Sequence, residues 1–148
     1  MTRFAKFVGG FAVAVAMVTA LPIIARADDK DVIEYREHIM KTLDAQTAAI
    51  GMIVSTQVGD DNLVAHAEAI AVTAKQALKS FEAKVPGGES KPEVWSNWPD
   101  FEKRMKDFVE KTDKLAASAK TGGVPVVMEQ MVDALTCKGC HDVYRSKK

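Results

Sequence analysis

The chain has 148 residues and a formal net charge of +0, with 47% hydrophobic and 27% charged residues. These values argue against a disordered tail, a collagen-like fibre or a coiled rod, because apolar residues are plentiful and low-complexity runs are absent. The balanced charge leaves no basic patch that would indicate a nucleic-acid partner. The length suits a single globular domain.

The first 27 residues differ in composition from everything after them. They carry three basic residues and no acid, and a nearly continuous apolar run follows the short basic start. Ala25-Arg26-Ala27 then matches the small-residue pattern of a signal-peptidase site. The pattern predicts a cleaved secretory signal peptide over 1–27 and a mature domain over 28–148. A transmembrane anchor is the alternative, because the run approaches spanning length, but Pro22 and the cleavage-like end favour the signal.

The mature part predicts two helices before its longest loop. Apolar residues recur at helical spacing from about 31 to 56 and again from about 63 to 83. Gly59 and the polar residues after it separate the two segments. The turn-rich stretch 85–97 should form the longest loop, and Trp95 and Trp98 should hold it against the domain.

Two more helices are expected after this loop. One begins at Pro99 and ends at the glycine pair 122–123, and another begins at Pro125 and continues almost to the C-terminus. No strand has an obvious place. Four helices of comparable length with mostly short connections predict an all-α, antiparallel up-down-up-down four-helix bundle.

The residues with the most specific chemistry are Cys137-Lys138-Gly139-Cys140-His141. This is the C-x-x-C-H pattern of covalent haem attachment. Cys137 and Cys140 can each add to one vinyl group of a haem, and the imidazole of His141 is then held beneath the iron as its proximal ligand. A structural zinc site would need four ligands, and a redox-active C-x-x-C pair usually begins a helix after a strand. Because the motif is expected near the end of the last helix, haem attachment is the favoured interpretation.

A second feature lies in the first predicted helix. Arg36 shares the apolar arc of that helix, and a buried arginine needs an anion, which a haem propionate would supply. Met40 lies one turn further along the same face. Its sulfur could approach the iron opposite His141. A core-filling methionine and an arginine that extends to solvent remain the alternatives.

These residues together resemble the class II cytochromes c, which comprise cytochrome c′ and its low-spin c-556-type relatives. The resemblance covers the whole mature chain. It rests on the signal peptide, the four helices, Tyr35 to Met40, Ile50-Gly51, the segment 95–101 and the C-terminal attachment motif. In this group the haem is attached near the C-terminus rather than near the N-terminus, and this sequence conforms.

The resemblance implies one covalently attached haem c and a role for each matching residue. Cys137 and Cys140 would form the thioethers, and His141 would be the proximal iron ligand. Arg36 would bind a propionate, and Arg145 would lie on the proximal side. Cytochromes c′ proper leave the iron five-coordinate and open to NO and CO, whereas their low-spin relatives place a ligating methionine at the position of Met40.

The sequence favours a periplasmic electron carrier with His/Met ligation, and not an enzyme. A five-coordinate cytochrome c′ that binds NO or CO is the alternative. Periplasmic redox proteins are the expected partners, and the resemblance also implies a homodimer through the first two helices. No stable membrane insertion is expected after signal cleavage. His38 should face solvent, and His66 should be packed or half-exposed rather than catalytic.

Overall fold

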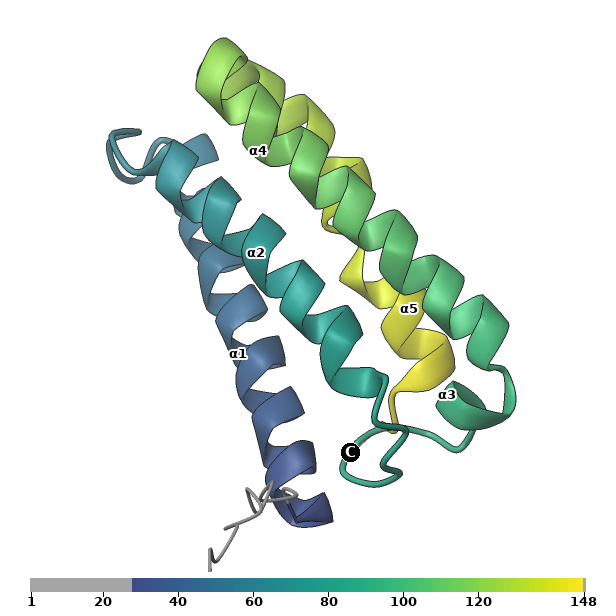
Figure 1. Cartoon of the computed structure of the whole chain (residues 1–148). Coiled ribbons are helices and arrows are strands. Elements are labelled where there is room, and N and C mark those ends of the chain that lie inside the picture. Colours follow the sequence, from purple (N-terminus) through teal and green to yellow (C-terminus); the bar gives the residue numbers. More distant parts are fainter. Residues whose placement is uncertain (1–27, 148) are drawn as a thin grey trace, which may run out of the picture.

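The structure is a computed structural model in which residues 28–147 are described, so the predicted signal peptide lies outside the described residues. The described elements are α1 (Asp29–Val54), α2 (Leu63–Phe81), α3 (Glu93–Ser96), α4 (Trp98–Ala134) and α5 (Cys137–Tyr144) (Figure 1). Within residues 28–147, extended pairing is limited to an isolated bridge between Ser90 and Arg145. None of the helices in that range has the length and apolar character that crossing a membrane requires.

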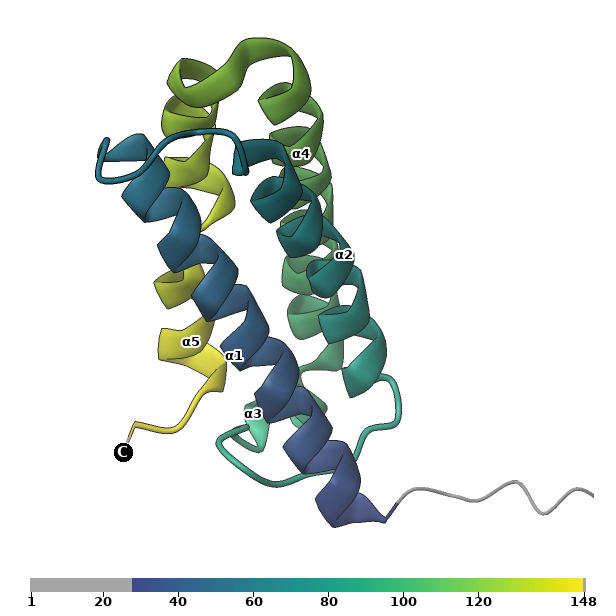
Figure 2. The same cartoon turned by 90° about the vertical axis from the view of Figure 1, so that its left-hand side faces the viewer.

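α4 contains two helices of the bundle. Gly123, at φ 62° and ψ −156°, is non-helical and lies inside the span of α4. An L-residue rarely adopts this conformation, so the glycine allows the chain to reverse, and Pro125 begins the returning helix. Figure 2 shows the reversal at the end of the bundle opposite α3. We call the part of α4 before Gly123 its first arm and the part from Pro125 onward its second arm. With α1 and α2, these two arms form the predicted four-helix bundle.

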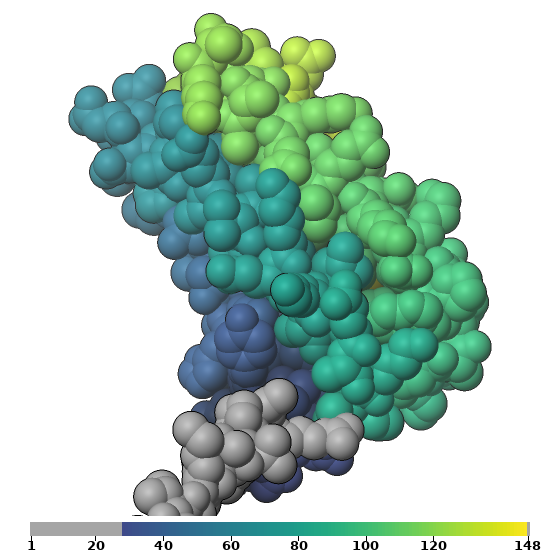
Figure 3. Space-filling view, viewed as in Figure 1, coloured from purple at the N-terminus to yellow at the C-terminus, as the bar shows by residue number. Residues whose placement is uncertain are grey.

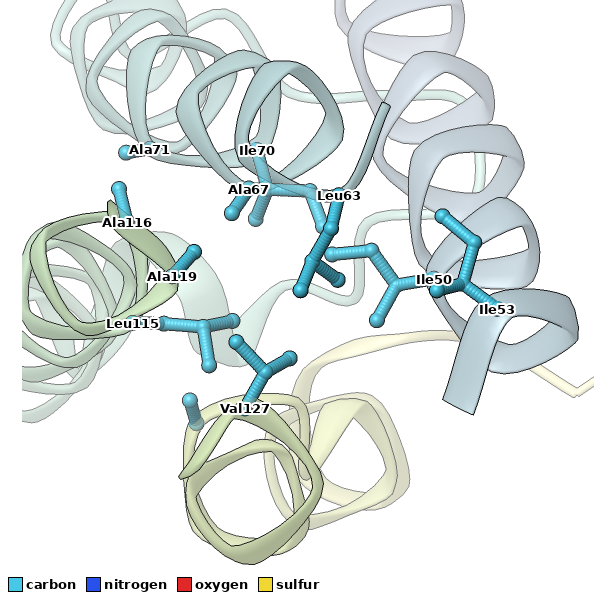
Figure 4. Close-up of a cluster of buried hydrophobic side chains, with 11 residues drawn as sticks. Ile50, Ile53, Leu63, Ala67, Ile70, Ala71, Leu115, Ala116, Ala119 and Val127 are labelled. Carbon is cyan, nitrogen blue, oxygen red and sulfur yellow. The ribbon is translucent and has the colours of Figure 1, made fainter. Parts of the chain in front are cut away.

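The core lies between α1, α2 and the two arms of α4. α2 packs against both α1 and α4, and its side chains lie between those of the other two helices on the face seen in Figure 3. Figure 4 shows apolar side chains from α1, α2 and both arms of α4 converging on one cluster. Its larger buried members are Ile50, Ile53, Leu63, Ile70, Leu115 and Val127. The helical spacing of the second predicted segment puts Leu63 and Ile70 on one face, and both are buried in this cluster.

A second cluster fills the end of the bundle near α3. It contains the aromatic side chains Phe81, Trp95, Trp98, Phe101 and Tyr144, which we call the aromatic cluster. Trp95 and Trp98 stack with their ring centroids 6.4 Å apart, and both are half-buried. The two tryptophans therefore hold the long loop against the bundle, as predicted.

The fourth helix is not continuous, which corrects the sequence prediction. It ends at Ala134, and α5 begins at Cys137 after two residues with non-helical backbone angles. The hydroxyl of Thr136 donates a hydrogen bond to the Asp133 carbonyl at 3.1 Å. Thr112 makes the same kind of bond inside α4 without a break, so this bond is compatible with the helix end but does not by itself cause it. The attachment motif therefore begins a short helix of its own.

Candidate haem site

The attachment motif occupies the first turns of α5. Cys137 is exposed, whereas Cys140 and His141 are half-buried. The helical spacing of the sequence also places Cys137 on the same face as Ala134, which is buried; this expectation is wrong, because the break between α4 and α5 leaves Cys137 exposed. Cys140 instead packs against the aromatic cluster. One cysteine of the pair thus faces the protein and the other faces solvent.

Three polar groups hold α5 against the first arm of α4. The hydroxyl of Tyr144 donates a hydrogen bond to Asp100 Oδ2 at 2.5 Å. Arg104 Nε donates to the same oxygen at 2.7 Å, and its Nη1 donates to the Gly139 carbonyl at 3.3 Å. Tyr144 also meets Phe101 edge to face at 5.2 Å. The backbone between the two cysteines is thereby fixed to α4.

The loop before α3 holds the other end of α5. The Lys91 backbone N–H donates to the Tyr144 carbonyl at 2.9 Å. The Lys91 ammonium donates to the Asp142 and Val143 carbonyls at 3.1 and 3.2 Å. These are carbonyls at the helix C-terminus, which lack intrahelical partners, so a cation there is favourable. The loop therefore caps the helix that carries His141.

Arg36 lies inside the protein, as the sequence predicts, and is only 4% exposed. Its Nη2 donates to the Val85 carbonyl at 2.7 Å. The guanidinium carbon lies 4.9 Å from the Phe81 ring centroid and 5.4 Å from that of Trp95. Burial lowers the pKa of Arg36, and no carboxylate among residues 28–147 pairs with it.

Two buried donors in this region have no hydrogen-bond partner within the described chain. They are Nη1 of Arg36 and Nε1 of Trp95. A buried polar group without a partner is costly, so an orphaned donor indicates a group that the protein itself does not provide.

Met40 is half-buried on α1 and packs against the aromatic cluster, as Cys140 does. The tertiary structure thus brings the first helix and the attachment helix to one cluster. His38 is exposed, with an ion pair to Glu34 at 3.6 Å, as expected for a solvent-facing residue. His66 Nδ1 lies 2.6 Å from Gln46 Oε1 and is half-buried.

Arg145 follows α5 directly. Its Nε lies 2.6 Å from Glu89 Oε2, and it lines a surface depression together with His141, Asp142 and Ser146. Burial lowers the pKa of His141, and the nearby positive charge of Arg145 lowers it further. The guanidinium is therefore on the same side of α5 as the imidazole.

The structure also bears on the two alternatives to haem attachment. Cys137 stands at the first position of a helix, the place typical of redox-active pairs, which the sequence did not predict. Burial raises the pKa of the Cys140 thiol. No strand precedes α5 among residues 28–147, whereas redox-active C-x-x-C pairs usually begin a helix that follows a strand. Among residues 28–147, no group of three or more His, Cys, Asp and Glu side chains is arranged to hold a metal ion.

The family model described as Cytochrome C' matches residues 31–145. The chain belongs to the cytochrome c′ family. Members of this family bind one covalently attached haem c, and this haem is the cofactor of the present protein. The cytochrome c′ fold therefore accounts for the four-helix bundle and for a C-terminal attachment motif.

Curated relatives include both subgroups of the family. Cytochrome c' of Pararhodospirillum photometricum is 34% identical over 125 residues, which are 76% of this chain and 94% of that protein. Cytochrome c' of Alcaligenes xylosoxydans xylosoxydans is 26% identical over 82% of this chain and 98% of its own length. A cytochrome c-556 of Agrobacterium tumefaciens (strain II Chrys) is 28% identical over 78% of this chain and 98% of its own length.

Solved structures of cytochrome c prime from Alcaligenes xylosoxidans have the same fold. A nitric oxide complex of a single-residue mutant matches with a TM-score of 0.77 and 25% identity, covering 83% of this chain and 100% of that one. A carbon monoxide-bound variant matches with a TM-score of 0.76 and 26% identity, covering 82% and 98%.

The described residues fit a haem c. The attachment segment offers two thiols and an imidazole within five residues, and α5 is held from both ends. The donors without partners on Arg36 and Trp95 are suited to an anionic acceptor, and a haem carries propionates. The donor set and the orphaned nitrogens therefore agree with the family's cofactor.

Sequence reasoning did not find the residues that position the motif. Asp100 and Arg104 form an i,i+4 ion pair at 2.7 Å, which the sequence presents as ordinary surface charge. Tyr144 lies one turn after Cys140, on the same side of α5. That spacing was the available signal, but the partner of Tyr144 lies 44 residues away in the sequence.

Proposed function

We propose that the chain holds its haem through thioether bonds to Cys137 and Cys140, with His141 as the proximal iron ligand. The spacing of the motif, the partial burial of His141 and the firm attachment of α5 support these roles. When bound, the haem supplies an iron that can take an axial ligand or change valence. The residues of the chain hold it, orient it and control access to it. Arg36 binds a propionate, and Arg145 lies at the proximal face.

The function that the observations support best is binding of NO or CO at a five-coordinate iron. The family match over residues 31–145 carries this proposal, because the solved structures that share the fold include a nitric oxide complex and a carbon monoxide-bound form. In this function Met40 is an apolar side chain that restricts the distal space. The packing of Met40 against the aromatic cluster suits that role.

Electron transfer with Met40 as the sixth ligand is the second candidate function, and it is the one that the sequence alone favours. It is supported by a flexible thioether one turn after the buried Arg36, and by the cytochrome c-556 relative. With both axial positions filled, the iron has no vacancy for a gas, and its reorganisation on changing valence is small. Periplasmic redox proteins would then be the partners.

Absorption spectra of the holoprotein and two matched variants distinguish these functions. Met40→Ala removes the candidate ligand, and Met52→Ala removes a methionine from an exposed position on the same helix. For gas binding, the wild type and both variants give high-spin ferric spectra, and CO shifts the reduced bands of all three. If the wild type is low-spin and insensitive to CO, and only Met40→Ala becomes high-spin, electron transfer replaces gas binding as the function.

The covalent linkage has its own test, because the chain contains only two cysteines. Wild-type haem should stay with the polypeptide in acid-organic solvent and in a denaturing gel. The double substitution Cys137→Ser, Cys140→Ser should lose it, whereas each single substitution should leave one bond. Haem that extracts from the wild type would contradict the proposed attachment.

We also propose that the protein is exported to the periplasm after removal of residues 1–27. The basic start, the apolar run and the cleavage-like Ala25-Arg26-Ala27 support this. Mass spectrometry of the exported protein should find Asp28 at the N-terminus. A homodimer through α1 and α2 remains a prediction, to be measured by sedimentation of the holoprotein.

A further inference from the structure

We propose that Trp95 binds the haem together with Arg36, by donating its indole N–H to the same propionate. This inference rests on the proposed attachment of the haem at Cys137 and Cys140. It assigns a cofactor-binding role to a residue that the sequence predicts only as an anchor for the long loop.

The first observation is that a nitrogen of Arg36 and a nitrogen of Trp95 are both buried without a hydrogen-bond partner, and that these two side chains are neighbours. Arg36 Nη1 and Trp95 Nε1 are the buried side-chain nitrogen or oxygen atoms in residues 28–147 that lack a hydrogen-bond partner. The Arg36 guanidinium carbon lies 5.4 Å from the Trp95 ring centroid. The two orphaned donors therefore belong to one neighbourhood, and one absent group could accept from both.

The second step concerns the chemistry of that group. A guanidinium and an indole can donate hydrogen bonds but have no acceptor, so the missing partner must be an acceptor. Because Arg36 is 4% exposed and no carboxylate of residues 28–147 pairs with it, an anion is strongly favoured over a neutral group. A carboxylate has two oxygens and can accept from two different donors at once.

Both side chains are held in place without the propionate. Val85 accepts a hydrogen bond from the other Arg36 nitrogen at 2.7 Å, which leaves Nη1 for another acceptor. Trp95 stacks on Trp98 and contacts Phe81 at 6.0 Å between ring centroids. This preorganisation lowers the entropic cost of binding the carboxylate.

Trp95→Phe in the holoprotein tests the proposal, because it removes the N–H and keeps an aromatic ring. Trp98→Phe is the matched control, since Trp98 is in the same stack and its indole nitrogen is not among the orphaned atoms. Covalent haem is first verified in each variant. A pH titration of the haem methyl NMR signals then measures the propionate pKa. Trp95→Phe should raise that pKa by about one pH unit, because a donor to the ionised form is lost. Trp98→Phe should match the wild type.

A second measurement does not require the Trp95→Phe variant to fold. The chain has two tryptophans, so Trp95 is the sole indole in Trp98→Phe. In that holoprotein, ultraviolet resonance Raman spectra should give the signature of a hydrogen-bonded indole N–H, and the signature should change as the propionate is protonated. An unbonded indole, or one insensitive to this protonation, overturns the proposal.

The outcomes separate this inference from the function on which it rests. If haem is covalently attached but the propionate titration is the same in the wild type, Trp95→Phe and Trp98→Phe, the role of Trp95 is overturned and the attachment stands. If the wild type carries no covalent haem, the proposed function fails, and the role of Trp95 fails with it.

Discussion

The hydroxyl of Tyr144 in α5 donates a hydrogen bond to Asp100 in α4 at 2.5 Å, across 44 residues of sequence. The same carboxylate oxygen accepts a hydrogen bond from Arg104 Nε, and Arg104 Nη1 donates to the Gly139 carbonyl between the two cysteines. The short attachment helix therefore depends on the first arm of α4 for its position. A helix of eight residues would not be stable without such tertiary contacts.

Tyr144→Phe should lower the free energy of unfolding by about 0.5–1.5 kcal/mol, because it removes one hydrogen bond and keeps the buried ring. Tyr144→Ala should lower it by about 3–5 kcal/mol, because it also leaves a cavity beside Phe101. Urea denaturation of the holoprotein measures both. Equal stability of Tyr144→Phe and the wild type would mean that the bond to Asp100 contributes nothing.

The same pair predicts a loss of stability at high pH. Burial, followed by the hydrogen bond to Asp100, raises the pKa of Tyr144 to about 12, whereas an unfolded tyrosine titrates near about 10. Since the folded state retains the proton longer, the stabilisation is fully present below pH about 10 and is lost as the pH rises to about 12. Denaturation of the wild type and Tyr144→Phe across this range should give a steeper decline for the wild type. Parallel declines would contradict the assignment to Tyr144.

The turn that reverses α4 offers a test of the fold. Gly123→Ala should destabilise the protein by about 1–3 kcal/mol, because φ 62° with ψ −156° is accessible essentially to glycine only. An alanine Cβ at this position would meet no neighbouring atom within 4 Å, so the cost is one of backbone strain alone. Gly51→Ala is the control. It lies in regular helix with equally open space, so it should stabilise the protein by about 0.5–1 kcal/mol. Thermal unfolding of both variants measures the difference, and a neutral Gly123→Ala would refute the strained turn.

Arg36 can be tested for its charge and for its shape. Arg36→Met should lower the free energy of unfolding of the holoprotein by about 1.5–3 kcal/mol, because hydrogen bonds that involve charged groups are lost. Arg36→Lys keeps the charge but loses the planar fork that donates to Val85 and, in the proposed role, to a propionate, so we expect it to recover only part of the loss. Guanidinium denaturation monitored at the haem band measures this series. A fully stable Arg36→Met would contradict a paired role for this residue.

The sequence by itself determined the long helical segments, the place where the chain reverses and the family's cofactor, and it predicted the residues that would hold that cofactor; it did not predict the short helix α3. Helical periodicity, the stop at Gly123 and the C-x-x-C-H motif are local patterns, and local patterns can be recognised without knowing the fold. The same reasoning placed Arg36 on a buried face. It failed at Leu135 and Thr136, where non-helical backbone angles divide a pattern that is continuous in the sequence.

Only the tertiary structure decided how these pieces are joined. The partner of Arg36 is a carbonyl 49 residues away, and the partner of Tyr144 is a carboxylate 44 residues away. No periodicity links such positions, because their proximity depends on how the helices pack and on the path of the loop between them. For the same reason, the packed structure, and not the sequence, shows that the buried nitrogens Arg36 Nη1 and Trp95 Nε1 lack a hydrogen-bond partner within residues 28–147.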